Sequence, residues 1–155
     1  MGSRILLRAL DELARDRTAG DPPVFGEVNF AAPDVDVDVF VASAPRLQPL
    51  ASRFTLYASD RDMAMAAARH ASGGHPRAGD SSEAIVVVAG MDTVDASAVR
   101  DDLFGHEYFG ESRPVLDIRL LLHDGAAAAD RPGTVRRFHH GRGYWRLLPA
   151  AAPES

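Results

Sequence analysis

Segments with helical spacing of apolar residues alternate along the chain with short runs that are apolar throughout. Apolar residues recur at three- and four-residue intervals in four stretches, which predicts amphipathic helices at residues 3–17, 36–52, 62–71 and 110–124. Two prolines, Pro45 and Pro49, are expected to bend or shorten the second helix. The runs between the helices are typical of buried strands and cover residues 25–32, 53–59 and 84–89. The third run, AIVVVA, is mostly β-branched and indicates a strand buried on both faces.

The order of these elements predicts an α/β fold. Strands that alternate with crossover helices form a parallel sheet with helices on both of its faces. Three strands are few for such a sheet, because a typical sheet has about five or six. Residues 126–133 are predicted to be a linker, and residues 135–148 form a basic, aromatic tail that can end in an irregular strand. We therefore expect one unit at residues 1–125, followed by a linker and tail at residues 126–155.

Composition narrows the possible functions. The 155 residues are 46% hydrophobic, which is enough for the core of one domain. The chain has no cysteine, which excludes a disulfide scaffold, a zinc–thiolate site and a cysteine nucleophile. A formal net charge of −5 favours neither nucleic acid nor an anionic membrane as a partner. No signal-peptide pattern and no apolar run near the roughly 20 residues of a membrane span is found, so we expect no membrane span and a cytoplasmic location.

Candidate chemistry lies after the predicted strands, because ligands and catalytic groups of open parallel sheets gather beyond the carboxyl ends of the strands. The carboxylates that follow these strands are Asp34, Asp36, Asp38, Asp60, Asp62, Asp92 and Asp95. A loop further on carries His106. A carboxylate that accepts a hydrogen bond from a histidine ring fixes its tautomer and stabilises the imidazolium, so the histidine can act as a general base. The residues therefore suit acid–base chemistry, and the chain contains no obvious nucleophile to complete it.

Five segments carry a family resemblance: MGSRILLRAL at residues 1–10, AAPDVD at 31–36, TLYASDRD at 55–62, MDTVDAS at 91–97 and GHEYF at 105–109. On these segments residues 1–124 resemble the C-terminal half of a bacterial alpha/beta-hydrolase family. Its members belong to the esterase/lipase superfamily and have no known substrate. The resemblance implies a partial alpha/beta-hydrolase fold, with about three parallel strands, flanking helices, and the N-terminal half of the sheet missing.

The same resemblance implies roles for four residues. Asp62 corresponds to the acid of a serine–histidine–acid triad and His106 to its base. In such enzymes the serine lies on a sharp strand-to-helix turn, and the backbone N–H of the next residue helps to bind the oxyanion. Met1 corresponds to that next residue and Gly2 to the elbow glycine, which places the serine one residue before Met1.

Two functions are expected from this arrangement. The first is the C-terminal portion of a serine hydrolase for an ester or acyl substrate, with acid and base present but inactive alone because the nucleophile is absent. The alternative is a non-catalytic remnant or split-half module that associates with itself or with a complementary N-terminal half. Missing strands would expose a sheet edge and an apolar face, which favours such association.

Simpler roles remain open for the two triad candidates. Asp62 can also be a first-turn carboxylate that stabilises a helix N-terminus, and Asp60 is its local competitor. His106 can be an ordinary surface histidine.

Other motifs are weak. DVDVD at residues 34–38 begins like a calcium loop, but Val39 and Pro45 occupy the positions of the required glycine and glutamate. We expect helix capping there, no metal and no cofactor. Arginines and aromatic residues at positions 136–145 could stack on nucleic-acid bases, but packing of this tail on the sheet is the simpler expectation in an acidic chain.

Overall fold

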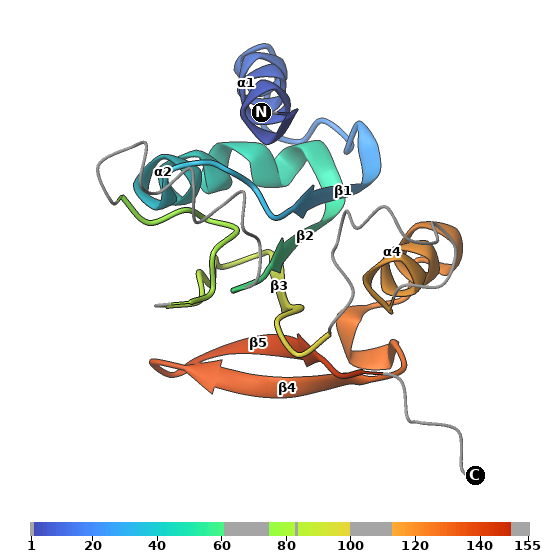
Figure 1. Ribbon diagram of the computed structural model, residues 1–155. Helices are drawn as coiled ribbons and strands as arrows, with labels where there is room; N and C mark the ends of the chain where they lie inside the picture. Colours follow the sequence, from blue (N-terminus) through green and yellow to red (C-terminus); the bar gives the residue numbers. More distant parts are fainter. Residues whose placement is uncertain (1, 61–74, 83, 100–112, 150–155) are drawn as a thin grey trace, which may run out of the picture.

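A five-stranded sheet with helices on both faces forms the framework (Figure 1). The computed structural model describes residues 2–60, 75–82, 84–99 and 113–149, and the following statements refer to these. The strands are β1 (Phe25–Ala31), β2 (Ala51–Ala58), β3 (Asp92–Asp95), β4 (Thr134–His139) and β5 (Arg142–Leu147). The helices are α1 (Gly2–Arg15), α2 (Val37–Leu47) and α4 (Arg113–Asp124), with 3₁₀ turns η1 (Gln48–Leu50) and η2 (Ala128–Asp130).

The strands are arranged in the order β1-β2-β3-β5-β4. The pairs β1–β2, β2–β3 and β3–β5 are all parallel, whereas β4 pairs with β5 in an antiparallel hairpin. His140 and Gly141 both have positive φ at the hairpin turn, as a tight two-residue connection requires. The parallel α/β sheet expected from the sequence is thus confirmed, and much of the segment expected as a tail extends it by two strands.

The apolar run at residues 84–89 is not a strand, so this prediction was wrong. Val86 and Val88 are buried in the main core instead. Gly90 (φ +77°) turns the chain, Met91 N donates to the carbonyl of Val88, and the chain then enters the sheet as β3. β-branched residues suit any extended, buried segment, so their presence could not distinguish a strand from a segment that covers the sheet.

The second helix is shorter than predicted, since it ends at Leu47 rather than at residue 52. Pro49 lies in the 3₁₀ turn that follows and has no N–H to extend the helical hydrogen bonds. At the other end, Asp36 Oδ1 accepts from the backbone N–H groups of Asp38 (3.0 Å) and Val39 (3.3 Å). This confirms the capping role expected within the acidic run.

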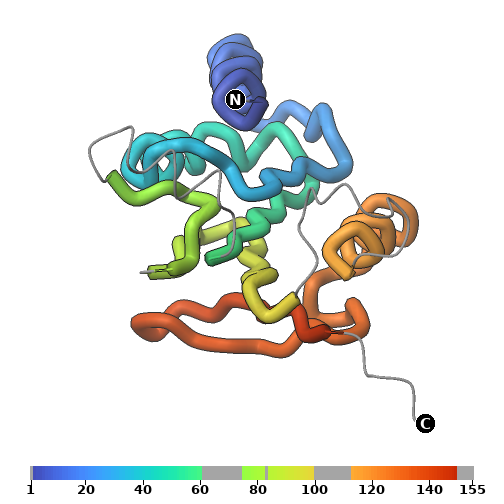
Figure 2. The backbone as a smooth tube through the Cα atoms, viewed as in Figure 1, coloured from blue at the N-terminus to red at the C-terminus, as the bar shows by residue number. Residues whose placement is uncertain are grey.

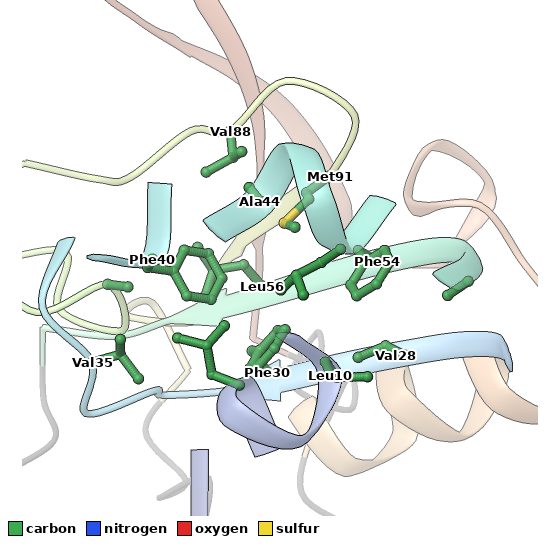
Figure 3. Packing of buried hydrophobic residues seen from close by; sticks show 14 of the residues in the cluster. Leu10, Val28, Phe30, Val35, Phe40, Ala44, Phe54, Leu56, Val88 and Met91 are labelled. Carbon is green, nitrogen blue, oxygen red and sulfur yellow. The ribbon is translucent and has the colours of Figure 1, made fainter. Parts of the chain in front are cut away.

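Each face of the sheet carries its own apolar core. On one face α1 and α2 pack against β1 and β2, and the rings of Phe30 and Phe40 meet edge to face at 5.1 Å (Figure 3). On the other face Tyr57 and Val94 pack with Ile118 of α4. Alternation of side chains along β2 explains the division, because Leu56 faces the first core and Tyr57 the second.

The two outer strands, β1 and β4, lie at opposite ends of the sheet (Figure 2). Each pairs on one side only within the described part of the chain. No helix in that part is long and apolar enough to cross a bilayer.

Candidate functional site

Three parallel strands end level with one another and bring their following loops to one edge. The ladders continue one residue past β1 and β3, with hydrogen bonds from Ala32 N to Tyr57 O (2.9 Å) and from Ala96 N to Ala58 O (2.8 Å). In the sequence, Asp62 comes four residues after the end of β2 and His106 eleven residues after the end of β3. This edge is therefore where the predicted acid–base chemistry would lie.

A hydrogen-bonded network around Asp95 connects the β2 and β3 ends. Asp95 is buried, and its Oδ1 accepts from Ser97 N at 3.0 Å. Its Oδ2 accepts from Arg146 Nε (2.9 Å) and Nη2 (2.8 Å). Ser97 Oγ lies 2.9 Å from Ser81 Oγ and accepts from Asp60 N at 3.0 Å. The loop after β2, the segment at Ser81 and the end of β3 are thus held together by polar contacts.

This network organises the edge of the sheet. The hydrogen bonds from Arg146 to Asp95 raise the pKa of the guanidinium above its usual range, so Arg146 stays a cation. Both Asp95 oxygens already accept hydrogen bonds from protein donors. Sequence reasoning placed Asp95 after a strand but missed Arg146, which lies 51 residues away in the segment expected as a tail.

The acidic run after β1 is held by arginines. Asp34 pairs with Arg4 (3.2 Å) and with the buried Arg77 (3.5 Å), whose segment packs closely on this loop. Gly79 N donates to Pro33 O at 3.1 Å, and a Cβ atom on Gly79 would lie only 2.7 Å from the Cα atom of Ala32. Among the described residues no group of three or more His, Cys, Asp or Glu side chains could hold a metal ion.

Three of the four residues given roles by the resemblance, Met1, Asp62 and His106, lie outside the described residues. Gly2 is described: it begins α1, is exposed, and has open space where a Cβ atom would be. The elbow assignment of Met1 and Gly2 and the triad assignment of Asp62 and His106 stay predictions. Asp60, the local competitor of Asp62, is exposed just after β2.

A second polar cluster, Tyr57–Asp117–Arg131, is buried on the α4 face and was missed by sequence reasoning. Tyr57 OH donates to Asp117 Oδ2 (2.7 Å), and Arg131 Nη1 donates to both Tyr57 OH and Asp117 Oδ2 at 2.6 Å. Asp117 Oδ1 and Arg131 Nε and Nη2 have no hydrogen-bond partner among the described residues. The cluster joins β2, α4 and the segment after η2, and no local pattern signals such a contact between residues far apart in sequence.

Burial controls the ionisation of this cluster. Loss of hydration raises the pKa of the Asp117 carboxyl, against the opposing effects of the Tyr57 hydrogen bond and the Arg131 charge. Burial and the neighbouring Asp117 also raise the pKa of the Tyr57 phenol, which therefore stays a hydrogen-bond donor. Tyr57 precedes Asp62 by five residues and Asp117 follows His106 by eleven, so the cluster ties together the two elements next to the predicted catalytic residues.

Comparison with known families gives one match. A family model described as "Alpha/beta hydrolase of unknown function (DUF900)" matches residues 1–123. No curated protein and no solved structure matches the chain. The matched region includes Asp62 and His106 and ends within α4, so the β4–β5 hairpin lies beyond it.

Proposed function

The chain belongs to the alpha/beta-hydrolase family of unknown function that matches residues 1–123, and from this premise we propose that it supplies the acid and the base of a serine-hydrolase triad. Asp62 orients His106, and His106 is the general base. The supporting observation is that the ends of β2 and β3 meet at one sheet edge, where Asp60 N lies 3.0 Å from Ser97 Oγ. The segments that carry Asp62 and His106 follow these two neighbouring strands.

The proposed reaction is hydrolysis of an ester or similar acyl substrate. His106 takes the proton of a serine hydroxyl while the serine oxygen attacks the acyl carbonyl, and the protonated ring then gives that proton to the departing alcohol. Water attacks the acyl-enzyme with His106 again as base, which releases the acid and restores the serine. The Met1 amide is one donor to the oxyanion. Hydrolysis of this kind consumes only water, and we propose no cofactor.

Residues 1–155 do not include the serine of the proposed elbow. We propose that it comes from polypeptide outside this sequence, at the position directly before Met1. Residues 1–155 alone then have no covalent step and only residual electrostatic effects. We also propose that the protein is cytoplasmic. Fractionation of cells that produce the complete gene product would test this location.

The test compares residues 1–155 with a chain extended by the codons that precede Met1 in the gene, using short p-nitrophenyl esters. We expect no triad-dependent turnover from residues 1–155, and turnover from an extended chain that carries a serine directly before Met1. In the extended chain His106→Ala should lower kcat by about 10⁶-fold and Asp62→Asn by about 10⁴-fold. The matched controls His75→Ala and Asp60→Asn change two exposed positions. Each should leave kcat within about threefold of that of the unmodified extended chain.

Two results would contradict the proposal. Turnover by residues 1–155 that His106→Ala abolishes would show that a nucleophile lies within this sequence. Turnover by the extended chain that survives His106→Ala, or that falls with Asp60→Asn and not with Asp62→Asn, would remove the assigned triad.

A split-half module is the second candidate, and exposed apolar residues on α1 favour it. Ile5, Leu6 and Leu13 are large, exposed and gathered on one arc of the helix, beside the buried Leu10. Within the described part of the chain β1 pairs on one side only, which leaves backbone donors and acceptors at its outer edge. Such features fit association with a second copy or with a complementary chain.

Sedimentation velocity tests this candidate directly. Self-association, or binding of an N-terminal hydrolase half, should be weakened by Leu6→Glu/Leu13→Glu. The control Val41→Glu, an equally apolar and exposed position on α2, should leave it intact. A protein that stays monomeric at high concentration and binds no complementary half would eliminate the split-half function.

A further inference from the structure

The β4–β5 hairpin has a charge opposite to that of the rest of the chain. Residues 134–147 contain four arginines and no aspartate or glutamate, a formal charge of +4. Since the total is −5, the remaining residues carry −9. The net charge therefore conceals a basic ribbon at one edge of an acidic molecule, which composition alone could not reveal.

One face of the hairpin combines aromatic rings with an arginine. Arg136 is paired with Trp145, and Phe138 with Gly143, so these four positions share a face. The Arg136 guanidinium lies 5.5 Å from the Phe138 ring centre and 5.7 Å from that of Trp145. Gly143 leaves space for the Arg136 guanidinium, because a Cβ atom at Gly143 would lie 3.2 Å from the Arg136 nitrogens Nε and Nη2. Phe138 remains 67% exposed, which makes it the most exposed large apolar residue described.

The opposite face is cationic. Side chains alternate between the two faces along each strand, so the opposite face carries Arg137, Arg142 and Arg146. Arg146 is paired with Asp95, whereas Arg142 donates to the carbonyl of Val87 and Arg137 to that of Arg136. Among the described residues neither Arg137 nor Arg142 forms a salt bridge with a carboxylate, so both charges are available to an external anion.

We propose that the β4–β5 hairpin is a docking surface for a membrane that exposes anionic lipid headgroups. The hairpin would meet the bilayer with its turn first, so that Arg137 and Arg142 on one face contact the lipid phosphates and Phe138 on the other face enters the boundary between headgroups and acyl chains. Arginines on an edge strand also prevent edge-to-edge pairing of sheets, but that role would not be served by an exposed phenylalanine beside them. The combination of an exposed ring with cations that have no carboxylate partner in the described part of the chain is what indicates a lipid surface.

Nucleic acid fits this surface less well. Base stacking needs open ring faces, and one face of each of the Phe138 and Trp145 rings already lies near the Arg136 guanidinium. A long polyanion would also run along the acidic body, whereas a flat bilayer can meet the hairpin alone.

The experiment uses the full 155-residue chain with vesicles of phosphatidylcholine, alone or mixed with phosphatidylglycerol. Trp145 is the only tryptophan, so a blue shift of its emission reports contact of the hairpin with lipid. We expect binding to the anionic vesicles and a loss of binding at high salt. Arg137→Gln/Arg142→Gln should weaken partitioning by about 25-fold, from about fivefold for each arginine near an anionic leaflet. Phe138→Ser should weaken it at low and at high salt.

The control Arg8→Gln/Arg119→Gln makes the same charge change at two exposed positions outside the hairpin. Its partitioning to the anionic vesicles should stay within about twofold of that of the unmodified chain. Equal binding to neutral and anionic vesicles, no binding to either, or an equal loss in the control would overturn the proposal. Binding of a short single-stranded RNA, or dimer formation through the hairpin, without vesicle binding would overturn it too. Ester hydrolysis is independent of all these outcomes.

Discussion

Replacement of Arg131 by methionine should be among the most destabilising single changes in the described part of the chain. Arg131 is fully buried, and its Nη1 lies 2.6 Å from Asp117 Oδ2. Arg131→Met fills most of the same volume but leaves the Asp117 carboxylate, among the described residues, with the Tyr57 hydroxyl as its one hydrogen-bond donor. The loss therefore comes from an uncompensated buried charge and not from a cavity.

The expected loss of stability in Arg131→Met follows from the burial of the ion pair. Removal of one partner of a buried ion pair costs about 3–5 kcal/mol, against at most about 1 kcal/mol for an exposed pair. In a domain of this size each kcal/mol shifts Tm by about 2–4 °C, so Arg131→Met should lower Tm by about 6–20 °C. The matched control is Arg15→Met, which breaks the exposed Arg15–Asp11 pair on α1 and should shift Tm by less than about 4 °C.

The whole Tyr57–Asp117–Arg131 cluster can be replaced to separate charge from packing. Three of its polar atoms have no hydrogen-bond partner among the described residues. The hydrogen bonds and ion pair of the cluster therefore offset only part of the free energy lost by removing its polar groups from water. The triple variant Tyr57→Phe/Asp117→Leu/Arg131→Met should therefore be within about 2 kcal/mol of the unmodified protein. Urea unfolding followed by circular dichroism measures both variants. The reasoning fails if Arg131→Met costs no more than Arg15→Met, or if the triple variant is as unstable as Arg131→Met.

The same cluster gives a pH dependence of defined sign. Burial raises the pKa of Asp117 in the folded state above its unfolded value of about 3.9. Between these two values the folded state binds more protons, so the contribution of Asp117 to stability falls as pH rises from about 4 and is constant above the raised pKa. Asp117→Asn should remove this fall, and Asp16→Asn, at an exposed position, should keep it. Unfolding free energies measured from pH 4 to pH 7 would refute the assignment if both variants behaved alike.

Three further changes test the framework around the sheet edge, each by urea unfolding. Asp36→Ala removes the cap of α2 and should cost about 1 kcal/mol, whereas Asp36→Asn should cost less. Gly79→Ala places a Cβ atom 2.7 Å from the Cα of Ala32 and should destabilise by more than about 1 kcal/mol; a neutral result would mean that the 75–82 segment can move away. Phe40→Ala removes the ring packed against Phe30 and should cost about 3–5 kcal/mol, while Val41→Ala on the exposed side of α2 should cost little.

Local patterns were enough to predict α1, β1 and β2, although three large apolar residues of α1, Ile5, Leu6 and Leu13, are exposed. They failed at β3, whose sequence DTVD carries two carboxylates in four residues. Asp95 can be buried there only because Arg146 pairs with it from 51 residues away, and a local pattern contains no information on that contact. The neighbouring apolar run at residues 84–89 was predicted as the strand because it has the composition of a strand, but it precedes the turn at Gly90 and is not part of the sheet.

The segment beyond the family match has a structural role at the candidate site. Arg131 and Arg146 both follow residue 123, yet each neutralises a buried carboxylate on an element adjacent to the predicted triad, Asp117 on α4 and Asp95 at the end of β3. A chain that ended at residue 125 would keep both carboxylates and lose both cations. The burial cost of two unpaired charges would then fall on the strand end and the helix that flank the segments of Asp62 and His106. We therefore regard residues 126–149 as part of the hydrolase unit, whether or not the hairpin also binds lipid.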